Sequence, residues 1–159
     1  MKTTKSNILF LLTLSLLSLS SCEYWWSRGQ LPSVEKLVED SITRLEQNES
    51  LYKESRPELL AHTKNIRSSI ARLLNTVSSS KQNSELLKEM IVFRKLFMEL
   101  EGKVSIGSRA ALGELSGQLR NFVQDANNGK NLEYEPFGLF ASRTMRFLSD
   151  ELAVPKPNF

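Results

Sequence analysis

The sequence predicts an all-α protein: a single-domain antiparallel helical bundle of four to five helices. Apolar residues recur at three- and four-residue steps in five successive segments between Val34 and Leu152, as they do along one face of a helix. No stretch alternates apolar and polar residues for long enough to predict a strand. The segments are joined by short polar links, which in helical bundles connect antiparallel neighbours.

The first two predicted helices begin at prolines. One starts after Pro32 and Ser33, with Ser33 as a candidate N-cap, and the next opens at Pro57, because proline fits the first turn of a helix. The first apolar face consists of Val34, Leu37, Val38, Ile42, Leu45 and Tyr52. The second consists of Leu59, Thr63, Ile66, Ile70, Leu73 and Val77. The alternating four-three spacing of the second face is typical of packed helices.

Three further helices continue this pattern. The third begins within residues 80–83, the fourth follows Ser108, and the fifth runs from Pro136 to about Leu152. Gly102 is predicted to cap the third helix in a left-handed conformation. The third face consists of Leu86, Met90, Phe93, Phe97 and Leu100. The fourth consists of Leu112, Leu115, Leu119, Phe122 and Ala126. The fifth consists of Phe137, Phe140, Ala141, Thr144, Leu148 and Leu152.

The N-terminus has the three parts of a secretory signal peptide. Two lysines precede an uncharged, leucine-rich run from Ile8 to Leu19, which closes on Leu19-Ser20-Ser21-Cys22. The run is about a dozen residues long, too short to cross a hydrocarbon core of about 30 Å as a permanent helix. The usual small residue at the cleavage site is followed here by a cysteine. One alternative is an ordinary signal peptide with a chance cysteine, and another is an uncleaved anchor.

At these four positions the chain resembles bacterial lipoproteins, whose lipobox reads Leu, small, small, Cys. The resemblance implies that residues 1–22 are a lipoprotein signal peptide. It also implies that Cys22 becomes the mature N-terminus, carrying fatty acyl chains such as palmitate. Enterobacterial lipoproteins kept at the inner membrane commonly have Asp after this cysteine, so Glu23 suits the outer membrane, facing the periplasm. The inner membrane and the cell surface remain alternatives.

Residues 23–33 form a short membrane-proximal tether to a helical bundle over residues 34–154, and residues 155–159 form a C-terminal tail. Tyr24, Trp25 and Trp26 follow the lipid site directly, and aromatic rings with one polar tip favour the headgroup zone. We expect an aromatic collar at the membrane surface. In the alternative, one of the tryptophans folds back onto the bundle.

Charge and cysteine content exclude several classes of protein. Lys2 and Lys5 lie in the signal peptide, so 19 of the 21 basic residues remain against 18 acidic ones, a net charge of +1. Nucleic-acid binding needs a clustered basic face, and this balance gives no case for one. Cys22 is the only cysteine, so no internal disulfide forms and stability must come from the apolar core.

The sequence offers no catalytic constellation. His62 is the only histidine, so no metal site or His–Cys dyad is predicted, and we expect it to be a half-exposed helix residue. No glycine-rich phosphate loop is present. Paired acids such as Asp150 and Glu151 are expected on a solvated face. We therefore predict no enzyme activity and no cofactor.

Gly113 and Gly117 lie four residues apart, on one face of the fourth helix. Each costs about 1 kcal/mol relative to alanine in an exposed helix interior, so a compensating role is expected. Small residues at this spacing let another backbone come close. The preferred interpretation is that the C-terminal helix packs there, so that Gly113→Leu destabilises the isolated domain. The alternative is a partner helix.

Two sets of charged residues are further candidates for a partner surface. Arg143 and Arg146 lie among the aromatic residues of the last helix, and Phe147 falls off its apolar face, so we expect Phe147 to be exposed. These residues either contact a partner or headgroups or simply solvate a helix. The second set is the modest basic face of the second helix, which either leans on anionic lipid or is solvated. It consists of Lys64, Arg67 and Arg72.

The function expected from these observations is non-enzymatic. Tethering and the absence of catalytic groups favour an accessory, structural or adaptor lipoprotein of the cell envelope, bound to membrane lipid through Cys22 and to an envelope protein through a helical face. The alternative is an apolar-ligand module whose helices part around a lipid. The residues expected to line that space are Phe93, Phe97, Phe122 and Phe140.

Overall fold

The structure, a computed structural model, describes residues 32–79 and 83–155. Its helices are α2 (Val34–Leu51), α3 (Pro57–Ser78), α4 (Asn83–Met98), α5 (Arg109–Asn127) and α6 (Tyr134–Ala153), with a 3-10 turn at Ile106–Ser108. These ranges contain helices and no strand, so the predicted helical bundle is confirmed. The predictions for Cys22, Tyr24, Trp25 and Trp26 fall outside the described residues.

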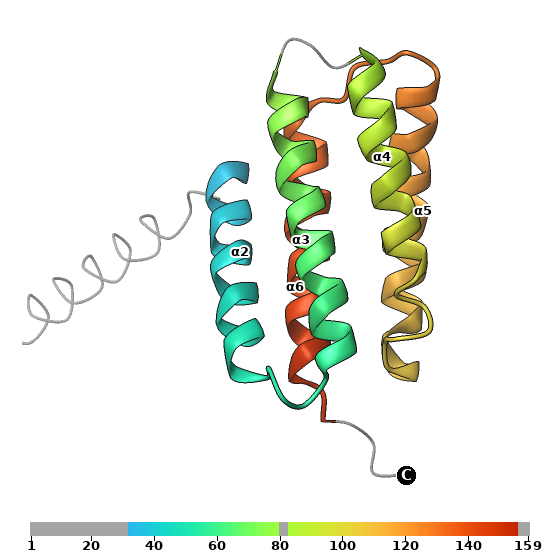
Figure 1. Cartoon of the computed structure of the whole chain (residues 1–159). Helices are drawn as coiled ribbons and strands as arrows, with labels where there is room; N and C mark the ends of the chain where they lie inside the picture. The colour runs from blue at the N-terminus through green and yellow to red at the C-terminus, as the bar shows by residue number, and fades with distance from the viewer. Residues whose placement is uncertain (1–31, 80–82, 156–159) are drawn as a thin grey trace, which may run out of the picture. The chain divides into compact units, whose positions relative to one another are not determined.

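Four of the helices form an up-and-down bundle. α3, α4, α5 and α6 run alternately in opposite directions, and α6 closes the ring by packing against both α5 and α3 (Figure 1). α2 lies outside this ring on α6. It runs parallel to α6, since Val34 lies against Gly138, Ser41 bonds Ser142 and Asn48 bonds Ser149. This parallel pair is the one departure from antiparallel packing among the helix pairs in close contact.

The core contains the predicted apolar faces. Every predicted residue of α3, α4 and α6 is buried, whereas Phe122 and Ala126 on α5 are partly buried. The centre is a cluster of phenylalanine rings from α4, α5 and α6. Its ring centroids lie 5.4–6.4 Å apart, in tilted and edge-to-face contacts. Its members are Phe93, Phe97, Phe122, Phe137 and Phe140. Each such pair contributes about 0.5–1.5 kcal/mol beyond area burial.

Helix ends follow the expected signals with one exception. Pro57 occupies the first turn of α3, and α5 ends at Asn127 ahead of Gly129, which has a φ of 73°. Gly129 is the only described residue in the left-handed region, so the predicted left-handed cap at Gly102 is wrong. The chain leaves α4 through consecutive turns instead, in which the amides of Lys103 and Val104 donate to the Leu100 carbonyl.

Small and polar side chains join α2 to α6. The hydroxyls of Ser41 and Ser142 lie 2.7 Å apart, and Asn48 Nδ2 donates to the carbonyl and hydroxyl of Ser149. A Cβ atom on Gly138 would lie 2.5 Å from Val34 Cγ1, so the Val34 side chain can take this position on α6 only because residue 138 is glycine. Gly138, rather than Gly113 or Gly117, is therefore the glycine that helix packing requires.

Glu151, near the end of α6, is buried, which contradicts the expected solvated face. Its carboxylate accepts from the Ser105 amide and hydroxyl at 2.9 Å and from the Ser108 hydroxyl. Arg56 Nη1 donates to the Glu151 carbonyl at 2.7 Å, and its Nη2 donates to the Lys103 carbonyl at 2.5 Å. One carboxylate and one guanidinium thus join α6 to the segments that precede α3 and α5.

These contacts set the ionisation of Glu151. Burial acts to raise the pKa of the carboxyl group, but it is outweighed by the hydrogen bonds from Ser108 and Ser105. The Arg56 guanidinium acts in the same direction as the hydrogen bonds, so the pKa of Glu151 lies below its usual value. The ionised carboxylate is therefore the form that stabilises the fold.

We expect Gly138→Ala and Gly113→Ala to change stability in opposite directions. Both substitutions gain about 1 kcal/mol of helix propensity. At residue 138 the new methyl group forces the Val34 side chain to move, and overpacking of this kind costs about 1–3 kcal/mol. At residue 113 nothing lies within 4 Å of the added atom. Urea unfolding measures both effects, and equal stabilisation by the two substitutions would contradict the required approach at Gly138.

We expect Glu151→Gln to lower the free energy of unfolding at neutral pH by about 1.5–3 kcal/mol, the range for hydrogen bonds to a charged group. A carboxyl group whose pKa is lowered by folding stabilises the native state above its unfolded pKa, about 4.3. That contribution is lost as the pH falls from this value through the folded pKa. Unfolding measured between pH 7 and pH 3 should thus show a steeper acid loss in the wild type than in the variant. Parallel curves would contradict this role.

Candidate functional site: the groove between α4 and α5

Gly113 and Gly117 on α5 are not covered by another helix. Gly113 is exposed, Gly117 is half-buried, and a Cβ atom on either would have no neighbour within 4 Å. The expectation that the C-terminal helix packs on them is therefore wrong, and the structure gives no reason for Gly113→Leu to destabilise the domain. α6 meets α5 through Phe122 instead, whose ring contacts Phe137 and Phe140.

The open side of Gly113 faces a groove of about 290 Å³ between α4 and α5. Its residues are Arg94, Phe97, Met98, Glu101, Arg109, Leu112, Gly113, Ser116, Leu119 and Arg120. The floor is apolar, since Phe97, Leu112 and Leu119 are core residues that reach the groove from below. The groove thus joins the core to the surface at the point where α5 carries no side chain.

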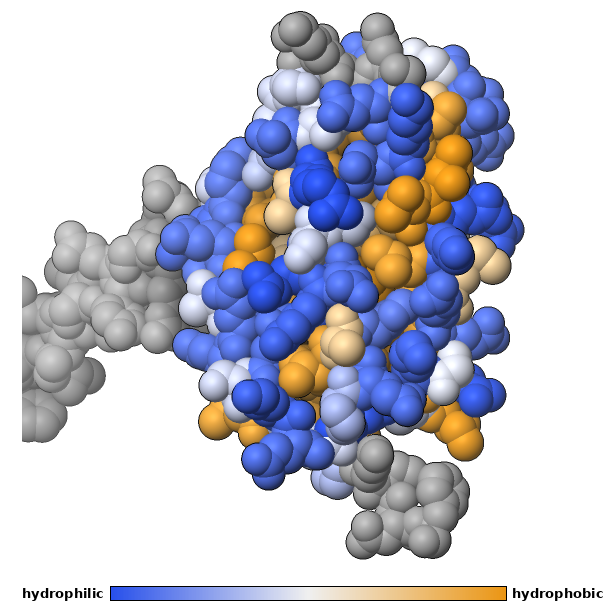
Figure 2. Space-filling model, in the orientation of Figure 1, coloured by the Kyte–Doolittle hydropathy of each residue, from blue (hydrophilic) through white to orange (hydrophobic). Residues whose placement is uncertain are grey.

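α4 also presents apolar side chains to solvent beside this groove. Ile91 is 56% exposed and Met98 is 64% exposed, and the two lie seven residues apart, which places them on one face of the helix. Ile91 and Met98 line a shallow depression with Arg94, Lys95 and Glu99. Figure 2 shows apolar residues gathered along α4 on this face of the molecule. α4 is therefore apolar both toward the core and on part of its outer surface.

The sequence carried a signal for this second face. Apolar residues stand next to the α4 core residues, in Leu86-Leu87, Met90-Ile91-Val92-Phe93 and Leu96-Phe97-Met98. The predicted face with alternating spacing includes Leu86, Met90, Phe93 and Phe97 from these groups and leaves the other apolar residues unexplained. Two adjacent apolar residues point about 100° apart on a helix, so these groups extend the apolar surface around α4 beyond the core.

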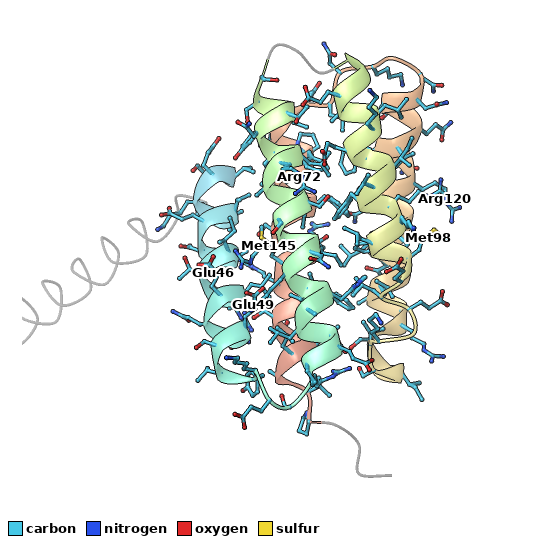
Figure 3. The ribbon with its side chains drawn as sticks, viewed as in Figure 1. Glu46, Glu49, Arg72, Met98, Arg120 and Met145 are labelled. Carbon is cyan, nitrogen blue, oxygen red and sulfur yellow. The ribbon has the colours of Figure 1, made fainter. Side chains whose placement is uncertain are left out.

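The charge on the groove is positive. Arg94, Arg109 and Arg120 line it, and none of them makes an ion pair with another described residue. Glu101 is the one carboxylate among the lining residues. Figure 3 shows Met98 and Arg120 on the same side of the molecule, with Glu46 and Glu49 on α2 at the other side.

Four of the six other described arginines are paired with carboxylates, whereas Arg143 and Arg146 are not. Arg44 bonds Asp150, and Arg56 bonds Glu151. Arg67 binds Glu49 through two nitrogens, at 3.2 and 3.0 Å, and also reaches Glu46. Arg72 bonds Glu89. Two of the three residues expected as a basic face on the second helix are thus neutralised by neighbours, whereas Lys64 is exposed.

The predicted contact residues of α6 lie elsewhere. Arg143 is exposed and lines a depression with α5 residues such as Asp125, whereas Arg146 Nε lies 3.3 Å from Ser41 Oγ. Phe147 is partly buried and packs against the core, so the expectation that it is exposed is wrong. These three residues do not line the groove that contains Gly113.

His62 is 7% exposed, so the expected half-exposed position is wrong. Its Nε2 lies 2.6 Å from the Leu96 carbonyl and its Nδ1 lies 3.7 Å from Glu99 Oε2, which joins α3 to α4. Within residues 32–79 and 83–155 no group of three or more histidine, cysteine or acidic side chains is arranged to hold a metal ion. Both ring nitrogens of His62 thus face acceptors on or next to α4.

Comparison with protein-family models, with curated proteins and with solved structures gives no match. Among the described helices, none combines the length and the apolar character needed to cross a membrane. The candidate site therefore rests on the geometry and charge of the α4–α5 groove alone.

Proposed function

We propose that this protein is a bacterial envelope lipoprotein, anchored through Cys22, that acts as an accessory or adaptor component by binding another protein through its helical surface. The observation that carries the binding proposal is the groove between α4 and α5, flanked by the exposed side chains of Ile91 and Met98. Large apolar side chains next to a hollow are a common feature of protein-binding surfaces. The lipobox residues Leu19-Ser20-Ser21-Cys22 support the anchor.

The packing of the core favours protein binding over the alternative of a lipid held between the helices. Phe93, Phe97 and Phe140 are at most 1% exposed, and their ring centroids lie 5.8–6.4 Å from one another. Phe122 fits against Phe140 at 5.5 Å. These rings fill the centre by contacting one another, so an acyl chain would have to separate them and lose those contacts.

We expect the mature native protein to begin at Cys22 and to carry a diacylglycerol thioether with an amide-linked acyl chain. Cys22→Ser removes the acylated sulfur and should release the domain from the membrane fraction, because one short aromatic tether supplies too little apolar surface for stable anchoring. Mass spectrometry of the N-terminal peptide tests the first statement and fractionation tests the second. An intact Met1, or a mature terminus without acyl chains, would rule out the anchor.

We expect photo-crosslinking from the bundle surface of the full-length lipidated chain, in membranes of its own source, to capture a protein. A crosslinking amino acid placed in turn at exposed positions on each described helix provides the scan, with Gln47 on α2 and Met98 on α4 among them. Lipid adducts at every position, with no protein adduct at any, would contradict the adaptor role.

A further inference from the structure

We infer that the α4–α5 groove receives an acidic amphipathic helix of the partner protein. This inference rests on the proposed function, because it names the chemistry of the partner that such an adaptor binds. The shape of the groove is the first argument. Two antiparallel helices form its walls, and Phe97, Leu112 and Leu119 form an apolar floor. A hydrophobic groove between helices is the surface into which an amphipathic helix lays its apolar face.

Gly113 determines how deeply a helix can enter. It stands in the interior of α5, where the bundle's own packing places nothing within 4 Å of a side chain. A leucine at this position would project into the groove that Gly113 lines. Gly117, one turn further along α5, is equally uncrowded but does not line the groove. The two glycines therefore form a matched pair for a test.

The arginines of the groove indicate which charge the partner helix carries beside its apolar face. Arg94 on α4 and Arg109 and Arg120 on α5 line the groove and have no carboxylate partner among the described residues. Arg109 and Arg120 are eleven residues apart, which is about 16 Å along the helix. A partner helix that lies along α5 meets both when its acidic residues are about three turns apart. Its apolar residues, at three- and four-residue steps, then face the groove floor.

A concave site favours a helix over a bilayer. The guanidinium groups lie around a hollow whose floor is formed by core residues, whereas a membrane surface is flat and meets projecting side chains. The exposed side chains of Ile91 and Met98 extend the apolar surface beyond the groove on the α4 side. An amphipathic helix in the groove covers Met98 and pairs Arg94 in a single binding mode.

The test uses the full-length lipidated chain in membranes of its own source, with a photo-crosslinking amino acid at Met98. The captured peptide is sequenced by mass spectrometry. We expect a peptide of another protein with acidic residues about three turns apart and apolar residues at helical steps. Arg94→Glu combined with Arg120→Glu should lower the adduct yield at least tenfold. Lys53→Glu combined with Lys64→Glu changes the net charge equally at exposed residues outside the groove and should leave the yield unchanged.

Leucine substitutions at Gly113 and Gly117 distinguish the effect of filling the groove from the effect of unfolding the domain. Gly113→Leu should lower the yield at least tenfold, whereas Gly117→Leu should leave it within twofold of wild type, and thermal unfolding checks that both variants fold. Capture of lipid alone, of a second copy of this chain, or of a segment without acidic residues would each overturn the inference. So would a yield that the two arginine substitutions leave unchanged. Protein adducts at other surface positions, with none at Met98, would overturn only the proposal for the groove. The absence of protein adducts at every position would overturn the proposed function as well.

Discussion

The burial of α6 between its neighbours is the constraint on which the rest of the bundle depends. One side of this helix carries Gly138, Ser142 and Ser149 against α2, and another carries the phenylalanines that meet α4 and α5. Glu151, in the last turn of the helix, has a buried carboxylate. Because eleven of the twenty residues of α6 are buried, its side chains fix the positions of the helices around it. α4 and α5 each pack closely on two helices, whereas α6 packs on three, and the groove between α4 and α5 stays open.

The helices and most of the core could be predicted from the sequence because apolar spacing and prolines indicate the same boundaries. The predicted start of the last helix at Pro136 was two residues late, since Tyr134 and Glu135 already belong to α6. The parallel α2–α6 pair was not predictable in the same way. It is formed by serines, Asn48 and Gly138, residue types that carry no hydrophobic signal and acquire meaning only when the facing helix is known.

The candidate site was predicted in part. The sequence singled out Gly113 as unusual in a helix interior, but it could not say whether the space beside it was filled, which depends on how α4, α5 and α6 are placed around it. The arginines of the groove were missed because a cation is informative only when its acidic neighbours are known. Arg67 and Arg94 look alike in the sequence, yet Arg67 is paired with Glu49 across the α2–α3 contact and Arg94 is not paired among the described residues. Glu151 was wrongly expected on a solvated face because the serines and the arginine that bind its carboxylate lie far from it in the sequence.

The parallel arrangement of α2 and α6 determines where the polypeptide enters and leaves the bundle. Val34, the first residue of α2, lies against Gly138 near the start of α6, and α6 then continues for another fifteen residues to Ala153, about 22 Å away along its axis (Figure 1). Entry and exit therefore occur at opposite poles of the bundle. A fluorescent or affinity domain joined directly after Ala153 would therefore lie at the pole remote from Val34, where α2 begins.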